Sequence, residues 1–196
     1  MDKQTFLTRF LLHNPLSGSS GDGSSPALIN QQELKKAAVL IPLVKRQNGL
    51  NIIFTERALA LRHHPGQVSF PGGKHEQSDP NLLYTAVRET QEEIGIFPEQ
   101  IVVFGRLAKL TTVSGFIVTP YLGFVESDHS IVIDPQEVKT VFEVPLAFLL
   151  NKKNTYLRHL IANKKRHFSY CIPYRNRFIW GATAQMLVNL QHHLDD

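Results

Sequence analysis

Three glutamates spaced for a single helical turn constrain this chain more than any other feature. Glu89, Glu92 and Glu93 stand at positions i, i+3 and i+4, so on a helix they project from one face within one turn of each other. Carboxylates held this close repel one another and weaken the helix. A folded domain that keeps them generally uses them to bind hard divalent cations. The spacing therefore predicts a helix that carries a Mg²⁺ or Mn²⁺ site.

The residues on either side of the glutamates predict the ends of this helix. Asp79 can act as its N-cap, Pro80 suits the first helical position, where its missing N–H costs nothing, and Gly95 is a C-terminal stop. We therefore expect a helix from Pro80 to Ile94. Apolar and small residues at helical spacing should form its buried stripe, and these are Leu82, Leu83, Ala86, Val87, Thr90 and Ile94.

Two adjoining motifs resemble a known family. The pattern Arg-Glu-x-x-Glu-Glu-x-Gly at 88–95 follows a double glycine, Gly72 and Gly73, and this arrangement looks like the Nudix box. Residues 54–73 read Phe-Thr-x-Arg, three residues, then Leu-Arg-x-His-x-Gly-Gln-Val-x-Phe-Pro-Gly-Gly, which is similar to the signature of the coenzyme A pyrophosphatase branch of Nudix hydrolases. Motifs with so many fixed positions are a specific signal. The resemblance implies an α/β fold of the Nudix type, an α/β/α sandwich with a mixed central sheet.

One position departs from the usual box. Asp79 stands six residues after Gly73, where the family has a glutamate, and eight residues rather than seven separate it from Arg88. The coenzyme A branch resembles this chain in that looser spacing, so the departure favours the branch. We interpret Asp79 as the helix N-cap rather than as a metal ligand.

The carboxylates and the resemblance together indicate the metal ligands. Glu89 and Glu93, one turn apart, are the first candidates, and Glu92 is a third ligand or binds through water. Backbone oxygen of the double glycine is a further candidate ligand. Arg88 is turned about 100° from Glu89 on the helix, so we expect it to orient a glutamate by a charge-assisted hydrogen bond.

A diphosphate substrate also needs cationic and hydrogen-bonding partners. Arg57 and Arg62 can clamp a phosphate through paired N–H donors. A surface ion pair would also explain each arginine, and the motif context favours the phosphate. His64 can hydrogen-bond a phosphate or a backbone group, and Gly72 and Gly73 let the backbone approach the substrate closely.

The general base is open among three acids. Glu137 lies in the run Asp-Pro-Gln-Glu-Val at 134–138 and resembles the late acidic residue that some Nudix enzymes place near their metals. An exposed loop acid is an equal alternative for it, and Glu92 and Glu76 compete for the role. We predict a catalytic set of Glu92, Glu137 and the positioning residue Arg88.

Patterning in the rest of the chain fits a sandwich. Apolar runs bounded by turn signals predict strands, and a C-terminal helix with leucines at helical spacing should cover the sheet face opposite the glutamate helix. The expected strands are 37–44, 51–55, 101–110, 116–125, 138–142 and 167–172, and the expected helix is 182–194.

The N-terminal residues differ in composition from the rest. Residues 1–30 contain an amphipathic segment, which should dock on the domain, and a Gly/Ser-rich linker at 17–25. Residues 31–196 should then form one domain, which the resemblance implies is a Nudix hydrolase domain. The first apolar run is too short and too charged for a signal peptide or a membrane span, and the single cysteine, Cys171, makes no intrachain disulfide. We therefore expect a cytoplasmic enzyme without membrane contact.

The charge of the chain favours a small anionic partner. A net charge of +4 and a pI near 9.2 should attract anions. A nucleic-acid binder would normally concentrate basic residues on one face together with aromatic stacking positions. The most basic clusters here are only those at 152–153 and 164–167, and solvated loops explain them as well, so we expect no nucleic acid. A coenzyme A-like nucleotide fits better, bound by a monomer or a homodimer.

The expected function is hydrolysis of the diphosphate of coenzyme A or its thioesters by a metal-dependent enzyme. The products would be adenosine 3',5'-bisphosphate and 4'-phosphopantetheine or its acylated form. One alternative is the same chemistry on a dinucleotide, ADP-ribose or a nucleotide sugar. Another is a ligand-sensing module without turnover, against which the complete glutamate set argues, because a pure binder has no need of three repelling carboxylates.

Overall fold

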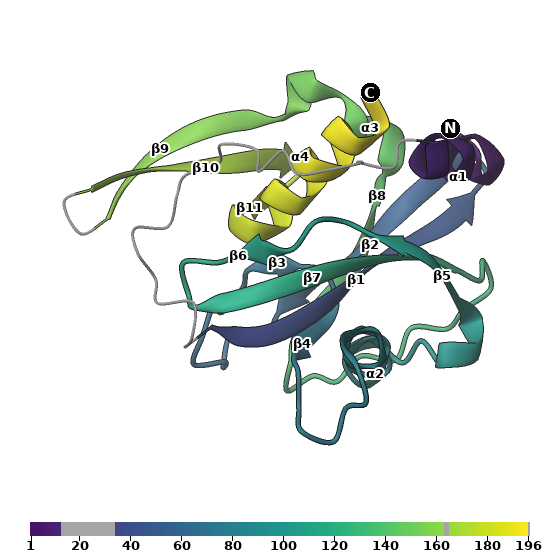
Figure 1. Cartoon of the computed structure of the whole chain (residues 1–196), viewed down its shortest axis with the longest axis horizontal. Coiled ribbons are helices and arrows are strands. Elements are labelled where there is room, and N and C mark those ends of the chain that lie inside the picture. The colour runs from purple at the N-terminus through teal and green to yellow at the C-terminus, as the bar shows by residue number, and fades with distance from the viewer. Residues whose placement is uncertain (13–33, 163–164, 196) are drawn as a thin grey trace.

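The computed structural model describes residues 1–12, 34–162 and 165–195, which form a mixed α/β sandwich as the sequence predicts (Figure 1). In chain order the elements are α1 (Lys3–Leu12), β1 (Lys35–Arg46), β2 (Gly49–Arg57), β3 (Val68–Ser69), β4 (Gly72–Lys74), α2 (Leu82–Ile94), η2 (Pro98–Gln100), β5 (Ile101–Arg106), β6 (Leu110–Thr111), β7 (Phe116–Val125), β8 (Val138–Pro145), α3 (Leu146–Leu150), η3 (Lys152–Asn154), β9 (Tyr156–Ala162), β10 (Lys165–Tyr174), β11 (Arg177–Trp180) and α4 (Gly181–Asp195).

The central sheet is mixed. Its strands lie in the order β3-β2-β1-β7-β5, while β4 pairs with β1, β6 with β7 and β8 with β2. Strand β1 runs parallel to β7, and the other described pairs are antiparallel. The hairpin predicted from the apolar runs at 37–44 and 51–55 is confirmed as β1 and β2. Strands β9, β10 and β11 form a second, antiparallel sheet.

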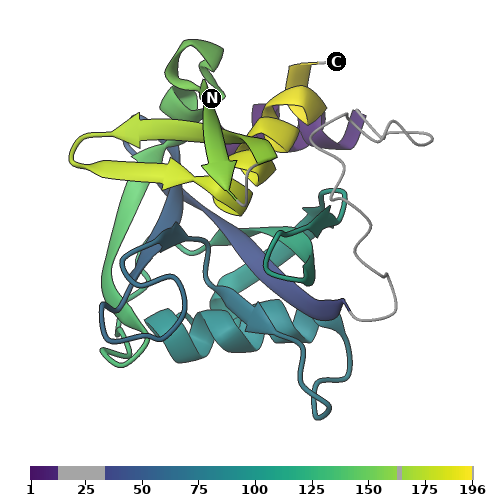
Figure 2. The same cartoon turned by 90° about the vertical axis from the view of Figure 1, so that its left-hand side faces the viewer.

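Helices cover both faces of the central sheet. On one face Ala86 of α2 joins a small apolar cluster with Ala38 and Leu40 of β1. Helices α1 and α4 lie on the other face (Figures 1 and 2), where the larger core includes Leu187 and Leu190 of α4. The prediction that the C-terminal helix lies opposite the glutamate helix is therefore confirmed.

Helix α1 covers one end of the larger core. Phe6 and Phe10 are buried, and the Phe10 ring meets Phe104 edge-on with 5.4 Å between centroids. The Nε2 atom of His193, on α4, lies 2.9 Å from the Phe10 carbonyl oxygen. Docking of the amphipathic segment is thus confirmed for Lys3–Leu12, whereas the linker predicted at 17–25 lies outside the described residues.

The strand expected at 101–110 is wrong in its second half. Strand β5 ends at Arg106, and β6 is a separate short strand. The register against β7 shifts between Val103 and Gly105, and a Cβ on Gly105 would stand 2.4 Å from the Phe10 ring. The bulge and the glycine therefore make room for α1, which the apolar pattern along the strand does not reveal.

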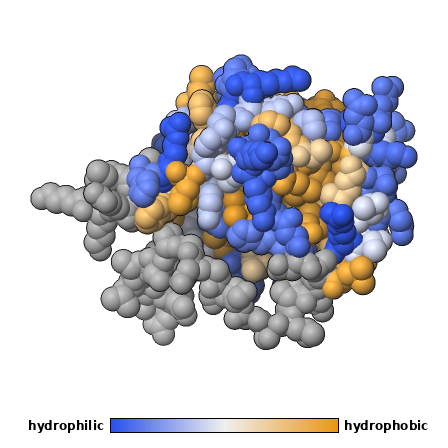
Figure 3. All heavy atoms as spheres, turned by 90° about the horizontal axis from the view of Figure 1, so that it is seen from above, coloured by the Kyte–Doolittle hydropathy of each residue, from blue (hydrophilic) through white to orange (hydrophobic). Residues whose placement is uncertain are grey.

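The second sheet projects from the sandwich as the long β9–β10 hairpin (Figure 1). Strand β10 confirms the strand predicted at 167–172. Figure 3 looks onto the side that carries α4 and this sheet, and shows apolar and hydrophilic residues interspersed there. Side chains at 160–167, including all of the basic cluster at 164–167, lie outside the described part of the chain. Among the described residues, no helix is both long enough and apolar enough to cross a membrane.

Candidate metal centre

The glutamate helix α2 begins later than the sequence predicts. It spans Leu82–Ile94, and its N-cap is Asn81, whose side-chain oxygen accepts a backbone hydrogen bond of 2.9 Å from the first turn. The predicted start at Pro80 and the predicted N-cap Asp79 are therefore wrong. The predicted end is confirmed, since Gly95 caps the C-terminus in the left-handed conformation with φ of 72°.

Asp79 is instead the buried partner of Arg88. Nε of Arg88 donates to Oδ1 of Asp79 at 2.9 Å, and Nη2 donates to Oδ2 at 3.1 Å. The hydroxyl of Thr85 and the N–H of Glu76 also donate to Oδ2, at 2.8 and 3.0 Å. These bonds, led by those from Arg88, hold the pKa of Asp79 well below its ordinary value. Because both oxygens of Asp79 accept these hydrogen bonds, Asp79 stays charged. The N-cap of the helix is instead Asn81, two residues later.

Arg88 connects Asp79 to two of the helix glutamates. Its Nη2 lies 2.9 Å from Oε1 of Glu89, and its Nη1 donates to Oε2 of Glu92 at 2.7 Å. The hydrogen bonds with Asp79 are the main cause of the raised pKa of Arg88, so the guanidinium stays charged. Glu92, whose side chain is 58% exposed, is thereby held at the surface of α2.

Three carboxylates meet, but they are not the three that helical spacing brings together. One oxygen each of Glu89, Glu93 and Glu137 lie within 4.8 Å of one another. Glu92, expected as a third ligand, lies outside this group. Glu137, expected only as a base, is the third member of the group and lies on the loop before β8.

Backbone hydrogen bonds hold that loop against α2 and against the residue that follows β2. The N–H of Asp134 donates to the carbonyl of Glu93 at 3.0 Å, and the N–H of Ala58 donates to the carbonyl of Glu137 at 2.9 Å. No spacing rule links position 137 to the helix. The available signal in the sequence is an acidic residue placed between an Asp-Pro turn and an apolar strand.

The carboxylate cluster is partly withdrawn from water. Burial raises the pKa of Glu93 to about 8, with Glu89 and Glu137 adding to the rise and Arg57 opposing it. Burial also raises the pKa of Glu89. Glu93 is 3% exposed, and its Oε2 has no hydrogen-bond partner among the described residues. Three close carboxylates with an orphaned buried oxygen fit a hard divalent cation, which would offset their repulsion and supply the missing partner.

The double glycine lies directly against this cluster. A Cβ on Gly73 would stand 2.4 Å from the carboxyl carbon of Glu89, and a Cβ on Gly72, where φ is 150°, would stand 2.4 Å from the carbonyl oxygen of Ala38. Both glycines belong to β4, which pairs with β1. Close packing against a carboxylate and a neighbouring strand therefore requires residues without side chains here.

The residues predicted to bind phosphate fall into two groups. Arg57 ends β2 close enough for its charge to act on Glu93, and its buried Nε has no hydrogen-bond partner in the described part of the chain. Arg62 and His64 are exposed in the loop between β2 and β3, where His64 has a φ of 55°. Glu76, a candidate base, is exposed and lies outside the carboxylate cluster.

Comparison with known proteins agrees with this geometry. The chain matches the NUDIX domain family model over residues 34–163, a range that contains all three clustered carboxylates. A relative from Pectobacterium atrosepticum, named "Uncharacterized Nudix hydrolase NudL", is 36% identical over 193 residues, covering 97% of this chain and 94% of the relative. Its counterpart from Salmonella paratyphi B is 38% identical over 186 residues, covering 94% and 91%.

A solved structure shows the same fold. The binary complex of an Ap4A hydrolase from C. elegans aligns with a TM-score of 0.50 at 18% identity, covering 58% of this chain and 82% of that one. At this identity the likeness concerns the architecture alone. The family match over residues 34–163, together with relatives similar along nearly their whole length, establishes that this chain belongs to the Nudix hydrolase superfamily.

Proposed function

We propose that this chain is a metal-dependent pyrophosphohydrolase that cleaves the diphosphate of coenzyme A or its thioesters. The observation that carries the reaction class is the cluster of Glu89, Glu93 and Glu137, with the charge of Arg57 acting on it. The substrate rests on the likeness of residues 54–73 to the signature of the coenzyme A branch. The products are adenosine 3',5'-bisphosphate and 4'-phosphopantetheine or its acylated form.

The three clustered carboxylates are the residues that would hold Mg²⁺ or Mn²⁺. A bound ion would neutralise phosphate oxygens and lower the pKa of an attacking water. Arg57 supplies a fixed positive charge and N–H donors for a phosphate. Arg88 is a positioning residue, because it bonds Glu89 on one side and is itself held by Asp79 on the other.

Glu137 is the strongest candidate for the base. It is the exposed member of the cluster, so water can reach its carboxylate, as a residue that accepts a proton from water requires. Glu92 is a weaker candidate because Arg88 engages its carboxylate outside the cluster. Arg62 and His64, on the exposed loop that follows β2, remain candidates for contacts with the outer phosphates of the substrate.

The test is product analysis after incubation with coenzyme A and Mn²⁺ in ¹⁸O-labelled water. We expect the two products named above, with the label in one of them, which identifies the attacked phosphorus. Equal kcat/KM for coenzyme A and ADP-ribose would defeat the narrower substrate claim. Tight binding of coenzyme A by calorimetry with no product formed would instead favour a ligand-sensing module.

A further inference from the structure

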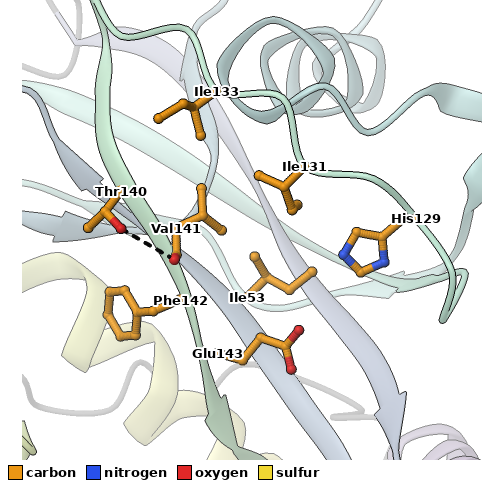
Figure 4. Close-up of a pocket in the computed structure, with 8 residues that line it drawn as sticks. All are labelled: Ile53, His129, Ile131, Ile133, Thr140, Val141, Phe142 and Glu143. Atoms are coloured by element: carbon orange, nitrogen blue, oxygen red, sulfur yellow. Dashed lines mark hydrogen bonds between the residues drawn. The ribbon is translucent and has the colours of Figure 1, made fainter.

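A cavity lies along β8 and the segment that precedes it (Figure 4). It has a volume of about 450 Å³, within the range of small-molecule sites. Ile53 and Val141 line it from the sheet, and Ile131 and Ile133 line it from the segment that precedes β8. Figure 4 shows these four side chains turned toward a common space.

Both segments of the chain that line the cavity lead to the proposed metal site. Ile133 directly precedes Asp134, whose N–H bonds the carbonyl of Glu93, and β8 starts at Val138, immediately after Glu137. The part of β8 that lines the cavity runs from Thr140 to Glu143. At about 3.3 Å per residue, these strand positions lie roughly 10 to 20 Å along β8 from Glu137. An extended group attached to a diphosphate at the carboxylates can therefore run along the cavity.

The charged group at the far end of the cavity is already neutralised. Glu143 accepts hydrogen bonds from Nη2 of Arg46 at 2.6 Å and from Nδ2 of Asn51 at 2.8 Å. Burial would raise the pKa of Glu143, and these bonds outweigh burial and lower it. His129, at the same end, lies with Nδ1 2.5 Å from the carbonyl oxygen of Glu126. Because these side chains already have partners, the lining favours an uncharged ligand over a charged one.

The open edge of β8 adds hydrogen-bonding capacity to the apolar lining. Within the described residues β8 pairs with β2 alone, and in an antiparallel ladder alternate backbone groups of an edge strand face away from their neighbour. The cavity is lined by consecutive residues of that strand, from Thr140 to Glu143. An extended ligand with amide groups can pair with this edge as a peptide strand would.

We infer that this cavity binds the uncharged, amide-containing arm of the substrate, which in a coenzyme A-type nucleotide is the pantetheine chain. The inference rests on the proposed function. Four apolar side chains pack against the arm, and the backbone of the β8 edge forms hydrogen bonds with its amides. The arm then extends along β8, away from the diphosphate at Glu89, Glu93 and Glu137.

The test compares two glutamates introduced next to each other. Ile131 lines the cavity and is 39% exposed, whereas Val132 is 68% exposed and does not line it. For Ile131→Glu we expect KM for coenzyme A to rise at least about tenfold with little change in kcat, because substrate and transition state lose the same contact. For Val132→Glu we expect both constants to stay within about twofold.

Spectra of the wild-type isoleucine methyl groups give a readout that needs neither turnover nor a folded variant. On titration with coenzyme A, and separately with pantetheine, the signals of Ile53, Ile131 and Ile133 should shift. Hydrolysis of coenzyme A with unmoved signals and an unchanged KM in Ile131→Glu would overturn the cavity assignment and leave the proposed function standing. Shifted signals without hydrolysis would overturn the proposed function and leave binding in the cavity standing. If the signals do not shift and no hydrolysis is detected, the cavity assignment and the proposed function are both overturned.

A second copy of the chain is the competing occupant. If Ile131→Glu changes the sedimentation coefficient of the protein while KM for coenzyme A is unaltered, the cavity belongs to a contact between copies and the inference is overturned. An unaltered sedimentation coefficient with a raised KM supports the substrate arm.

Discussion

Glu92 and Glu93 are neighbours in sequence with opposite surroundings. The Glu93 carboxylate is buried, carries an oxygen without a partner in the described residues, and lies among other carboxylates. The Glu92 carboxylate faces solvent and bonds Arg88. Removing one negative charge should therefore have very different effects at the two positions, which makes them a matched pair for experiment.

Glu93→Gln should reduce kcat by several orders of magnitude with the fold intact, because a ligand charge is lost from the proposed metal site. Glu92→Gln should reduce it far less. The measurement is steady-state hydrolysis at saturating Mg²⁺, with circular dichroism to check folding. Unchanged turnover in Glu93→Gln would remove Glu93 from the site, and an equal loss in Glu92→Gln would return Glu92 to the ligands.

The raised pKa of Glu93 predicts that metal affinity depends on pH. Without metal its pKa is about 8, so below that pH the residue is mostly protonated and a cation must displace the proton. We expect Mn²⁺ affinity to rise as the pH approaches 8 and to level off above it. Calorimetry in buffers of different ionisation enthalpy should detect a proton released on binding at neutral pH, and no release would contradict the assignment.

The raised pKa of Glu93 also makes the stability of the metal-free protein depend on pH. The folded pKa of about 8 lies above the ordinary glutamate pKa of 4.5, so the contribution of Glu93 is fully present below pH 4.5 and is lost as the pH rises through 8. In Glu93→Gln this loss should be absent. Urea denaturation of both proteins across this range, without metal, measures the difference.

At the scale of the helix, α2 depends on an ion pair whose acidic partner lies outside the helix in sequence. Asp79 precedes the N-cap but bonds Arg88 in the middle of the helix. Asp79→Asn should destabilise the protein by about 3 kcal/mol at neutral pH, because it removes the buried carboxylate that is the main partner of the partly buried Arg88 guanidinium. Since the pKa of Asp79 is lowered from 3.8, the difference should be present above that pH and shrink as the pH falls.

Urea denaturation at neutral and acid pH measures this effect. The control is Glu99→Gln, which removes an exposed carboxylate from the nearby turn η2 and should change the free energy of unfolding by less than about 0.5 kcal/mol. Equal stabilities of Asp79→Asn and the wild type at neutral pH would show that Asp79 contributes no net ion-pair energy.

Local patterns predict the helices and strands well and predict their partners poorly. Helical spacing identifies α2, and apolar runs identify β1, β2 and β7, because both depend on a few neighbouring residues. Asp79 is misassigned because Asp and Asn both cap helices, and which of them does so depends on an arginine two turns later. Glu137 enters the cluster through the path of the whole chain, so no spacing along the helix can place it.

Across the whole molecule, the central sheet separates two sets of contacts. The glutamate helix, which carries Glu89 and Glu93 of the carboxylate cluster, lies on one face, and α1, α4 and the larger core lie on the other (Figure 1). Changes in the larger core should therefore lower stability with little effect on the chemistry. Substitutions in the N-terminal helix α1 should therefore change the free energy of unfolding without changing kcat.

Phe10→Ala should lower the stability of the protein without altering kcat. The ring is 6% exposed, packs edge-on against Phe104 and fills the space that Gly105 leaves open. Removing it should cost about 3–5 kcal/mol, which lowers the melting temperature by roughly 10 °C for a chain of this length. Leu12→Ala, at the exposed end of the same helix, should change stability by less than about 0.5 kcal/mol. Thermal melts and steady-state kinetics below the transition measure both effects, and a large loss of kcat in folded Phe10→Ala would show that the two faces are coupled.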